Sequence, residues 1–164
     1  MERQLDLFAD AAGSPNDGII LEYINPLTGG SALPTLRCCA QRLKPGFSGQ
    51  RHRKTASTVF YVIEGEGTLK AGDTELHWKA RDVFVVPTWT WYELINASGS
   101  ASATLFSVSD APLLEAAQLY REEPESTLRR SVVARAAQPP KAGTQDTTAG
   151  SSGIKTQGGR SRDE

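Results

Sequence analysis

Residues 57–86 read STVFYVIEGEGTLKAGDTELHWKARDVFVV, and this stretch decides the fold. It holds four short runs rich in Val, Ile, Phe, Tyr and Thr, separated by turns rich in glycine and charge. The segment Lys70-Ala-Gly-Asp73 between two alternating runs is a hairpin signal, because Gly72 can take a positive φ at little cost. The stretch therefore predicts antiparallel β-structure.

The same pattern continues on both sides of this stretch. Between residues 19 and 109 we expect eight short strands: Ile19–Tyr23, Thr35–Leu43, Ser57–Ile63, Gly67–Ala71, Thr74–Trp78, Asp82–Val86, Trp91–Ile95 and Ala103–Val108. No helical pattern lies between them. Short strands at this spacing indicate a closed or sandwiched antiparallel barrel, so the fold class is all-β.

The chain divides by composition into three zones. We expect an N-terminal arm over 1–18 with a short helix at 2–10, one β-domain over 19–123, and a disordered tail over 124–164. The tail is mostly Gly, Ser, Thr, Gln, Lys and Arg beyond residue 139, and such a segment buries too little apolar surface to offset the entropy of ordering.

One C-terminal helix is predicted over residues 111–121. Asp110 is in place to cap it and Pro112 falls in its first turn. Its apolar stripe would be Leu113, Leu114, Ala117 and Tyr120.

Composition excludes several classes of function. A length of 164 residues suits one domain, and a net charge of −1 argues against a nucleic-acid partner. The sequence has no apolar run long enough for a membrane helix and no signal-peptide pattern. Cys38 and Cys39 are neighbours and cannot bridge on a strand without strain, so we expect one of them buried and a cytoplasmic protein.

Two strands are apolar on both faces, Val59–Ile63 and Val83–Val86. A barrel wall in water normally alternates, so the outer face must also be covered. Cover by the N-terminal segment and the 111–121 helix is one explanation, and a subunit interface is the other. Trp89 and Trp91 are expected to be core or interface residues rather than platforms for a substrate.

Residues 45–65, PGFSGQRHRKTASTVFYVIEG, resemble the first cupin motif, which is a Gly, five residues, His-x-His, a Glu, and a Gly after six more. Gly46, His52 and Gly65 keep their places in it. The second motif runs Gly, Pro, His and Asn at fixed spacing. Its four places hold Arg81, Pro87, Tyr92 and Asn96.

Four further segments narrow the resemblance: 23–35, 83–91, 105–110 and 119–123. They are similar to the C-terminal cupin of the gentisate 1,2-dioxygenases, whose relatives include salicylate and 1-hydroxy-2-naphthoate dioxygenases. The resemblance implies a single cupin, a double-stranded β-helix or jelly-roll barrel. Members of that family are bicupins with a ring-cleaving Fe(II) held by three histidines in the N-terminal half, so an isolated second half is implied here.

The resemblance also marks four metal-ligand positions, of which this chain retains only His52. Lys54, Thr58 and Tyr92 occupy the other three, and the second histidine, His77, lies outside both motifs. An ammonium with a pKa of about 10.4 does not ligate metal at neutral pH. We therefore expect no metal and assign no catalytic residue; Fe(II) is the expected cofactor only if the family activity is retained.

The side chains of His52 and Lys54 are two residues apart, so they share one strand face, with Arg51 and Arg53 on the other. By the family pattern the first face looks into the barrel, where Tyr92 joins it. One hypothesis is a polar lumen of His52, Lys54 and Tyr92 that binds a small aromatic carboxylate. The other is that Lys54 satisfies an internal carboxylate or extends to the barrel mouth.

Two functions remain at this point. The first is a gentisate 1,2-dioxygenase-like protein of aromatic-acid degradation without its own iron site. The second is a non-catalytic cupin that binds a small aromatic acid or serves as an oligomerisation module, with a second copy or another cupin as its partner.

Overall fold

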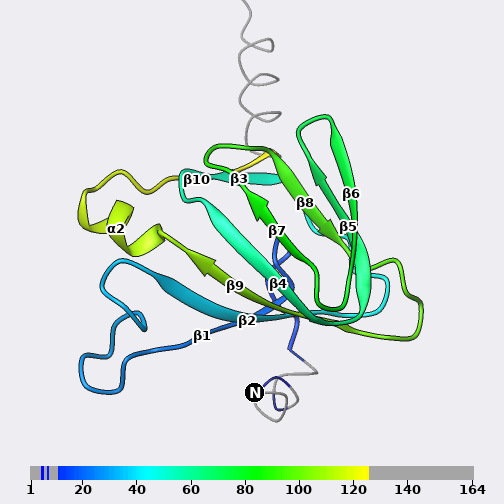
Figure 1. Ribbon diagram of the computed structural model, residues 1–164, viewed down its shortest axis with the longest axis horizontal. Helices are drawn as coiled ribbons and strands as arrows, with labels where there is room; N and C mark the ends of the chain where they lie inside the picture. The colour runs from blue at the N-terminus through cyan, green and yellow to red at the C-terminus, as the bar shows by residue number, and fades with distance from the viewer. Residues whose placement is uncertain (1–4, 6, 8–10, 126–164) are drawn as a thin grey trace, which may run out of the picture.

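The computed structural model describes Leu5, Leu7 and residues 11–125. Ten strands form two antiparallel sheets that face each other (Figure 1). The first sheet contains, in spatial order, β1 (Ile19–Glu22), β2 (Arg37–Leu43), β9 (Ala103–Ser109), β4 (Thr58–Glu64) and β7 (Val83–Val86). The second contains β10 (Glu122–Pro124), β3 (His52–Lys54), β8 (Tyr92–Ile95), β5 (Glu66–Ala71) and β6 (Thr74–Lys79). The predicted all-β fold class is confirmed.

The predicted hairpin closes as the sequence indicates. Strands β5 and β6 pair in register from Glu66↔Lys79 to Ala71↔Thr74. The two residues between them form the turn, and Gly72 takes a φ of 56°. The positive φ at Gly72 is the conformation that fits a two-residue hairpin to the twist of its strands.

The core lies between the two sheets and consists of inward-facing side chains. In β4 the burial alternates strictly from Thr58 to Val62. Two aromatic rings from neighbouring strands, Phe60 and Phe84, stack with centroids 5.1 Å apart. The main cluster also includes Leu43, Val62, Leu69, Trp78, Val86, Tyr92, Leu94, Ala103 and Leu105.

Two three-residue strands were not among the eight expected ones. Strand β3 pairs with β8 through His52↔Tyr92, and β10 pairs with β3 through Glu122↔Lys54. Strand β10 reaches Pro124, one residue into the segment expected to be the tail. The rest of that tail, from residue 126, lies outside the described residues, as does the helix expected over 2–10 apart from Leu5 and Leu7.

The helix prediction over 111–121 is wrong in its length. Helix α2 (Ala111–Ala116) stops because Gln118 adopts a left-handed φ of 60°. The amide of Leu119 then donates to the carbonyl of Leu114 at 2.8 Å, which is the bonding of a left-handed helix end. Asp110 is the N-cap residue without a side-chain capping bond; its Oδ1 accepts from the Ser57 amide at 2.9 Å instead.

Among the described residues, the outer face of the first sheet is covered at the end formed by β1 and β2. Leu5 packs there, fully buried, against Ile19 and Ala40. The expected cover by the 111–121 segment is absent in the described residues, since Leu113 is 51% and Leu119 61% exposed. The described part of the N-terminal segment therefore covers β1 and β2, whereas Val59, Tyr61, Val83 and Val85 on the apolar strands β4 and β7 are exposed. A subunit interface stays a prediction for these two strands.

No helix among the described residues has the length and hydropathy of a membrane span.

Candidate functional site

A cavity of about 180 Å³ lies inside the barrel, between the two sheets and the chain segments that close one end. Its polar wall comes from elements far apart in the sequence. The titratable and hydroxyl side chains that line it include Asp17, Arg37, Lys54, Thr58, Tyr92, Tyr120 and Glu122. Acidic, basic and hydroxyl side chains of the barrel therefore lie together around this cavity.

The structure brings the four sequence-predicted positions together. Lys54, Thr58 and Tyr92 line the cavity. His52 lies directly behind Tyr92, with ring centroids 4.3 Å apart, because β3 and β8 place the two residues opposite each other. Arg53 points to the other face of β3, as the alternation of strand side chains requires.

His52 is fully buried and has one ring nitrogen fixed. Its Nδ1 lies 2.9 Å from the Gln50 carbonyl oxygen, which can only accept, so Nδ1 carries the proton and donates. Burial lowers the pKa of His52 below its usual 6.5 despite the opposing effect of Asp17, so the ring is neutral at pH 7. Nε2 therefore carries a lone pair and no proton. The Nε2 atom lies 3.6 Å from Asp17 Oδ1.

Lys54 is held between two carboxylates. Its Nζ lies 3.0 Å from Asp17 Oδ2 and 3.7 Å from Glu122 Oε1. Burial alone would lower the pKa of Lys54, but the two carboxylates outweigh it and raise that pKa above its usual 10.5. Lys54 is thus an ammonium that satisfies internal carboxylates, the second of the two hypotheses for this residue.

Asp17 and Glu122 were not predicted from the sequence. The Ser14 hydroxyl oxygen accepts from the Asp17 amide at 3.2 Å, and Gln41 Nε2 donates to the Asp17 carbonyl at 2.6 Å. Glu122 arrives through the pairing of β10 with β3, opposite Lys54. Glu122 belongs to the 119–123 segment that carries the family resemblance, whereas nothing in the turn-rich sequence around Asp17 marks it.

Both cavity tyrosines are neutral phenols. Burial raises the pKa of Tyr92 well above 10, and burial followed by the charge of Glu122 raises the pKa of Tyr120 to about 12. The Tyr120 hydroxyl donates to Glu122 Oε2 at 3.2 Å. Neither phenol is a ready phenolate ligand at neutral pH.

Three of these groups have the donor chemistry of a metal site. Ligand atoms of Asp17, His52 and Glu122 all lie within 4.8 Å of one another. One imidazole with two carboxylates suits a divalent transition metal. The same two carboxylates, however, already bind the Lys54 ammonium, so the group in contact with them in this structure is a cation of the chain itself.

Trp89 and Trp91 both pack against Arg53 on the outer face of the second sheet. The guanidinium of Arg53 lies 4.2 Å from the Trp89 ring centroid and 4.5 Å from that of Trp91. Arg53 Nη2 also donates to Glu123 Oε2 at 2.7 Å. Arg53, stacked on the two tryptophans and bonded to Glu123, therefore stabilises the pairing of β10 with β3. This pairing also places Glu122 at the cavity.

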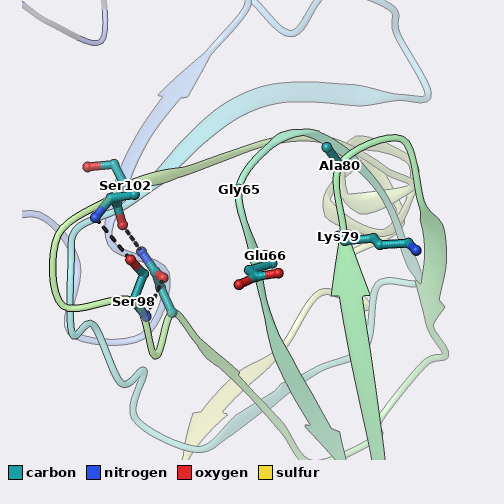
Figure 2. A pocket seen from close by; sticks show the side chains of 8 residues that line it. Gly65, Glu66, Lys79, Ala80, Ser98 and Ser102 are labelled. Carbon is teal, nitrogen blue, oxygen red and sulfur yellow. Dashed lines mark hydrogen bonds between the residues drawn. The ribbon is translucent and has the colours of Figure 1, made fainter.

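A second hollow of about 410 Å³ lies at the ends of β5 and β6 (Figure 2). Glu66 and Lys79 stand on its strand side, and the Ser98–Ser102 loop forms the opposite side. Its buried amide, Asn96, donates to the carbonyls of Leu43, Lys44 and Ala101. The Asn96 side-chain amide therefore holds the backbone of the loop and is not free to bind a ligand. For this reason we place the candidate site in the barrel cavity.

The neutral state of His52 has a measurable consequence for stability. As pH falls below about 6.5, the unfolded chain gains a proton on His52 that the folded chain excludes, so the free energy of unfolding should fall by up to about 1.4 kcal/mol per pH unit. Urea unfolding between pH 7 and pH 5.5 measures this slope. His52→Gln should flatten it, whereas His77→Gln, at an exposed side chain, should leave it unchanged. Equal slopes in both variants would contradict a neutral buried His52.

Comparison with known proteins identifies a cupin domain in this chain. A cupin-domain family model matches residues 40–109. The chain is 47% identical to 5-aminosalicylate 1,2-dioxygenase of Comamonas sp. over 75% of this chain and 33% of that protein. It is 43% identical to 1-hydroxy-2-naphthoate 1,2-dioxygenase of Nocardioides sp. (strain KP7) over 76% of this chain and 32% of that protein.

A solved structure shows the same likeness. Salicylate 1,2-dioxygenase from Pseudoaminobacter salicylatoxidans, in its adducts with gentisate, matches with a TM-score of 0.65 and 34% identity. The match covers 76% of this chain and 34% of that one. This chain spans about a third of the length of each of these relatives.

Proposed function

Because this chain is a cupin of the gentisate 1,2-dioxygenase family, equivalent to the C-terminal part of its longer relatives, we propose that it is a non-catalytic cupin module of aromatic-acid degradation. Its contribution is structural: it supplies a folded barrel that associates with a second copy of itself. Ring cleavage of a gentisate- or salicylate-type substrate belongs to a cupin that carries an iron site.

The observation that carries this proposal is the ion pair in the cavity. Lys54 stands at the second ligand position of the cupin motif and is bonded to Asp17 at 3.0 Å. Ring cleavage through Fe(II) needs deprotonated ligands and open coordination positions for substrate and O₂. A charged ammonium offers neither a lone pair nor an open position, and it neutralises one of the carboxylates that an iron ion would need.

A small aromatic carboxylate is the ligand that the gentisate adducts of the relative suggest. In this chain the ammonium group that could form an ion pair with such an anion in the cavity is that of Lys54. Asp17 and Glu122 already neutralise its charge, and they would repel a third carboxylate in a cavity of about 180 Å³. We therefore assign binding of the aromatic acid to a cupin that carries an iron site, and not to this chain.

An activity assay tests the proposal directly. The purified chain, given Fe(II), O₂ and gentisate or salicylate, should form no more ring-opened product than Fe(II) in buffer, because the cavity has no vacant set of iron ligands. Absorbance of the ring-opened product is the readout, and His52→Ala is the matched control. Iron-dependent turnover in the wild type that disappears in His52→Ala would contradict the proposal.

The surface through which the module would associate is an apolar ladder on the outer face of the first sheet. We define the outer ladder as Val59, Tyr61, Val83, Val85, Phe106 and Val108. Cross-strand register places Val59 beside both Val85 and Val108, and Tyr61 beside both Val83 and Phe106. Four of the six are more than 40% exposed. Contiguous apolar surface of this kind marks interaction sites, and we propose a second copy of this chain as its partner.

A cytoplasmic location is part of the same proposal. Cys38 and Cys39 are both free, and Cys39 is buried. Burial raises the pKa of the Cys39 thiol to about 11, so it stays protonated and unreactive. Unpaired cysteines are typical of a reducing compartment.

A further inference from the structure

We propose that Asp17, His52 and Glu122 form a divalent transition-metal site that the Lys54 ammonium blocks. Lys54 takes the place of an ion at this site, so the wild-type cavity excludes metal while a chain with a shorter, neutral residue at position 54 binds it. The inference rests on the proposed function only in assuming that the wild-type cavity is metal-free.

The first support is the spacing of the ligand atoms. One oxygen each from Asp17 and Glu122 and one nitrogen from His52 lie within 4.8 Å of one another. With metal–ligand distances of about 2.0–2.2 Å, the ligand atoms around one tetrahedral ion are about 3.3–3.6 Å apart. His52 Nε2 and Asp17 Oδ1 already have this spacing at 3.6 Å, so a movement of about an ångström by the Glu122 carboxylate would complete the set.

The second support is His52, which is independent of the acidic pair. Its side chain has 0% exposure, and its Nε2 finds no hydrogen-bond partner among the described residues. A buried nitrogen of this kind is costly unless something binds it. The bond from Nδ1 to the Gln50 carbonyl holds the ring with Nε2 3.6 Å from Asp17 Oδ1, and such second contacts usually orient a metal-bound histidine.

The third support is the balance of charge. Asp17 and Glu122 contribute two negative charges next to a neutral imidazole, and Lys54 contributes one positive charge. The other cation lining the cavity, Arg37, is paired with Glu115 at 2.9 Å and with Glu22 at 3.3 Å. A divalent ion would neutralise both carboxylates. Lys54 prevents this because its Nζ lies within ion-pair distance of the same two side chains.

The experiment uses Lys54→Ala in the full chain and follows Co²⁺ binding by calorimetry and by the visible absorption of the bound ion. The dissociation constant for Co²⁺ should fall by at least about 100-fold relative to the wild type, since three ligands become available to one ion. Removing the imidazole in Lys54→Ala/His52→Ala should abolish this gain. Lys54→Gln, which keeps a neutral donor near the carboxylates, is the second variant if Lys54→Ala does not fold.

Each other outcome decides against the inference. Equal Co²⁺ affinity in the wild type and both Lys54 variants would show that Lys54 blocks nothing. Tight binding that survives the loss of His52 would place the ion elsewhere. Failure of the folded variants to bind Co²⁺ overturns this inference alone, whereas turnover by the wild type overturns the proposed function.

Discussion

Replacing Asp17 with Asn is expected to lower the free energy of unfolding by about 3 kcal/mol, because it leaves the Lys54 ammonium buried with a single, more distant carboxylate. Asp17 is 8% exposed and provides the 3.0 Å contact, whereas Glu122 lies 3.7 Å away. Asparagine keeps the size of the side chain and its backbone bonds, so the loss reports the charge. Urea denaturation at pH 7 measures it.

Two controls separate the ion pair from other effects of this substitution. Asp73→Asn, at an exposed position in the β5–β6 turn, should change stability by no more than about 0.5 kcal/mol. Adding Lys54→Met to Asp17→Asn should recover part of the loss, since a neutral pair has no buried charge left uncompensated. A loss below about 0.5 kcal/mol in Asp17→Asn would show that Lys54 does not depend on Asp17.

The second large effect is expected from substitutions in the outer ladder, which should weaken self-association of the chain. The pair Val83→Lys and Val85→Lys on edge strand β7 should raise the dissociation constant of the wild-type assembly by at least about 100-fold, because it places two charges in an apolar contact. Both valines are more than half exposed in the single chain, at 63% and 53%, so the fold should tolerate the change. Sedimentation or light scattering across a concentration series gives the constant.

The matched control for the outer ladder is Leu27→Lys. Leu27 is 93% exposed on the loop between β1 and β2 and does not belong to the outer ladder, so its replacement should leave association unchanged. A monomeric wild type at micromolar concentration would contradict a second copy as the occupant. An assembly that persists equally in the β7 variant would place the interface on another surface.

Much of the barrel could be predicted from the sequence because its longer strands have a strong period. The alternation in β4 and the turn at Gly72 each have a local physical cause. The grouping of His52, Lys54 and Tyr92 followed from the same alternation together with the motif spacing. The end of helix α2 could not be predicted, because the left-handed residue that terminates it is Gln118 and not a glycine, and no proline follows it closely.

The partners of Lys54 could not be predicted for a different reason. Asp17 lies in a turn and Glu122 in a three-residue strand, and neither segment is long enough to show a period. Their meeting depends on β10 adding to the edge of β3, a contact between residues 68 positions apart at Glu122↔Lys54. A sequence pattern therefore identified the unusual cation but not the two carboxylates that explain it.

The metal content of the wild-type chain tests the central claim most directly. Protein purified from iron-supplemented cells, without chelators, should contain far less than one iron per chain by elemental analysis, and the same low amount in His52→Ala, because the Lys54 ammonium holds the carboxylates that an ion would need. One iron per chain in the wild type, lost in His52→Ala, would contradict the account.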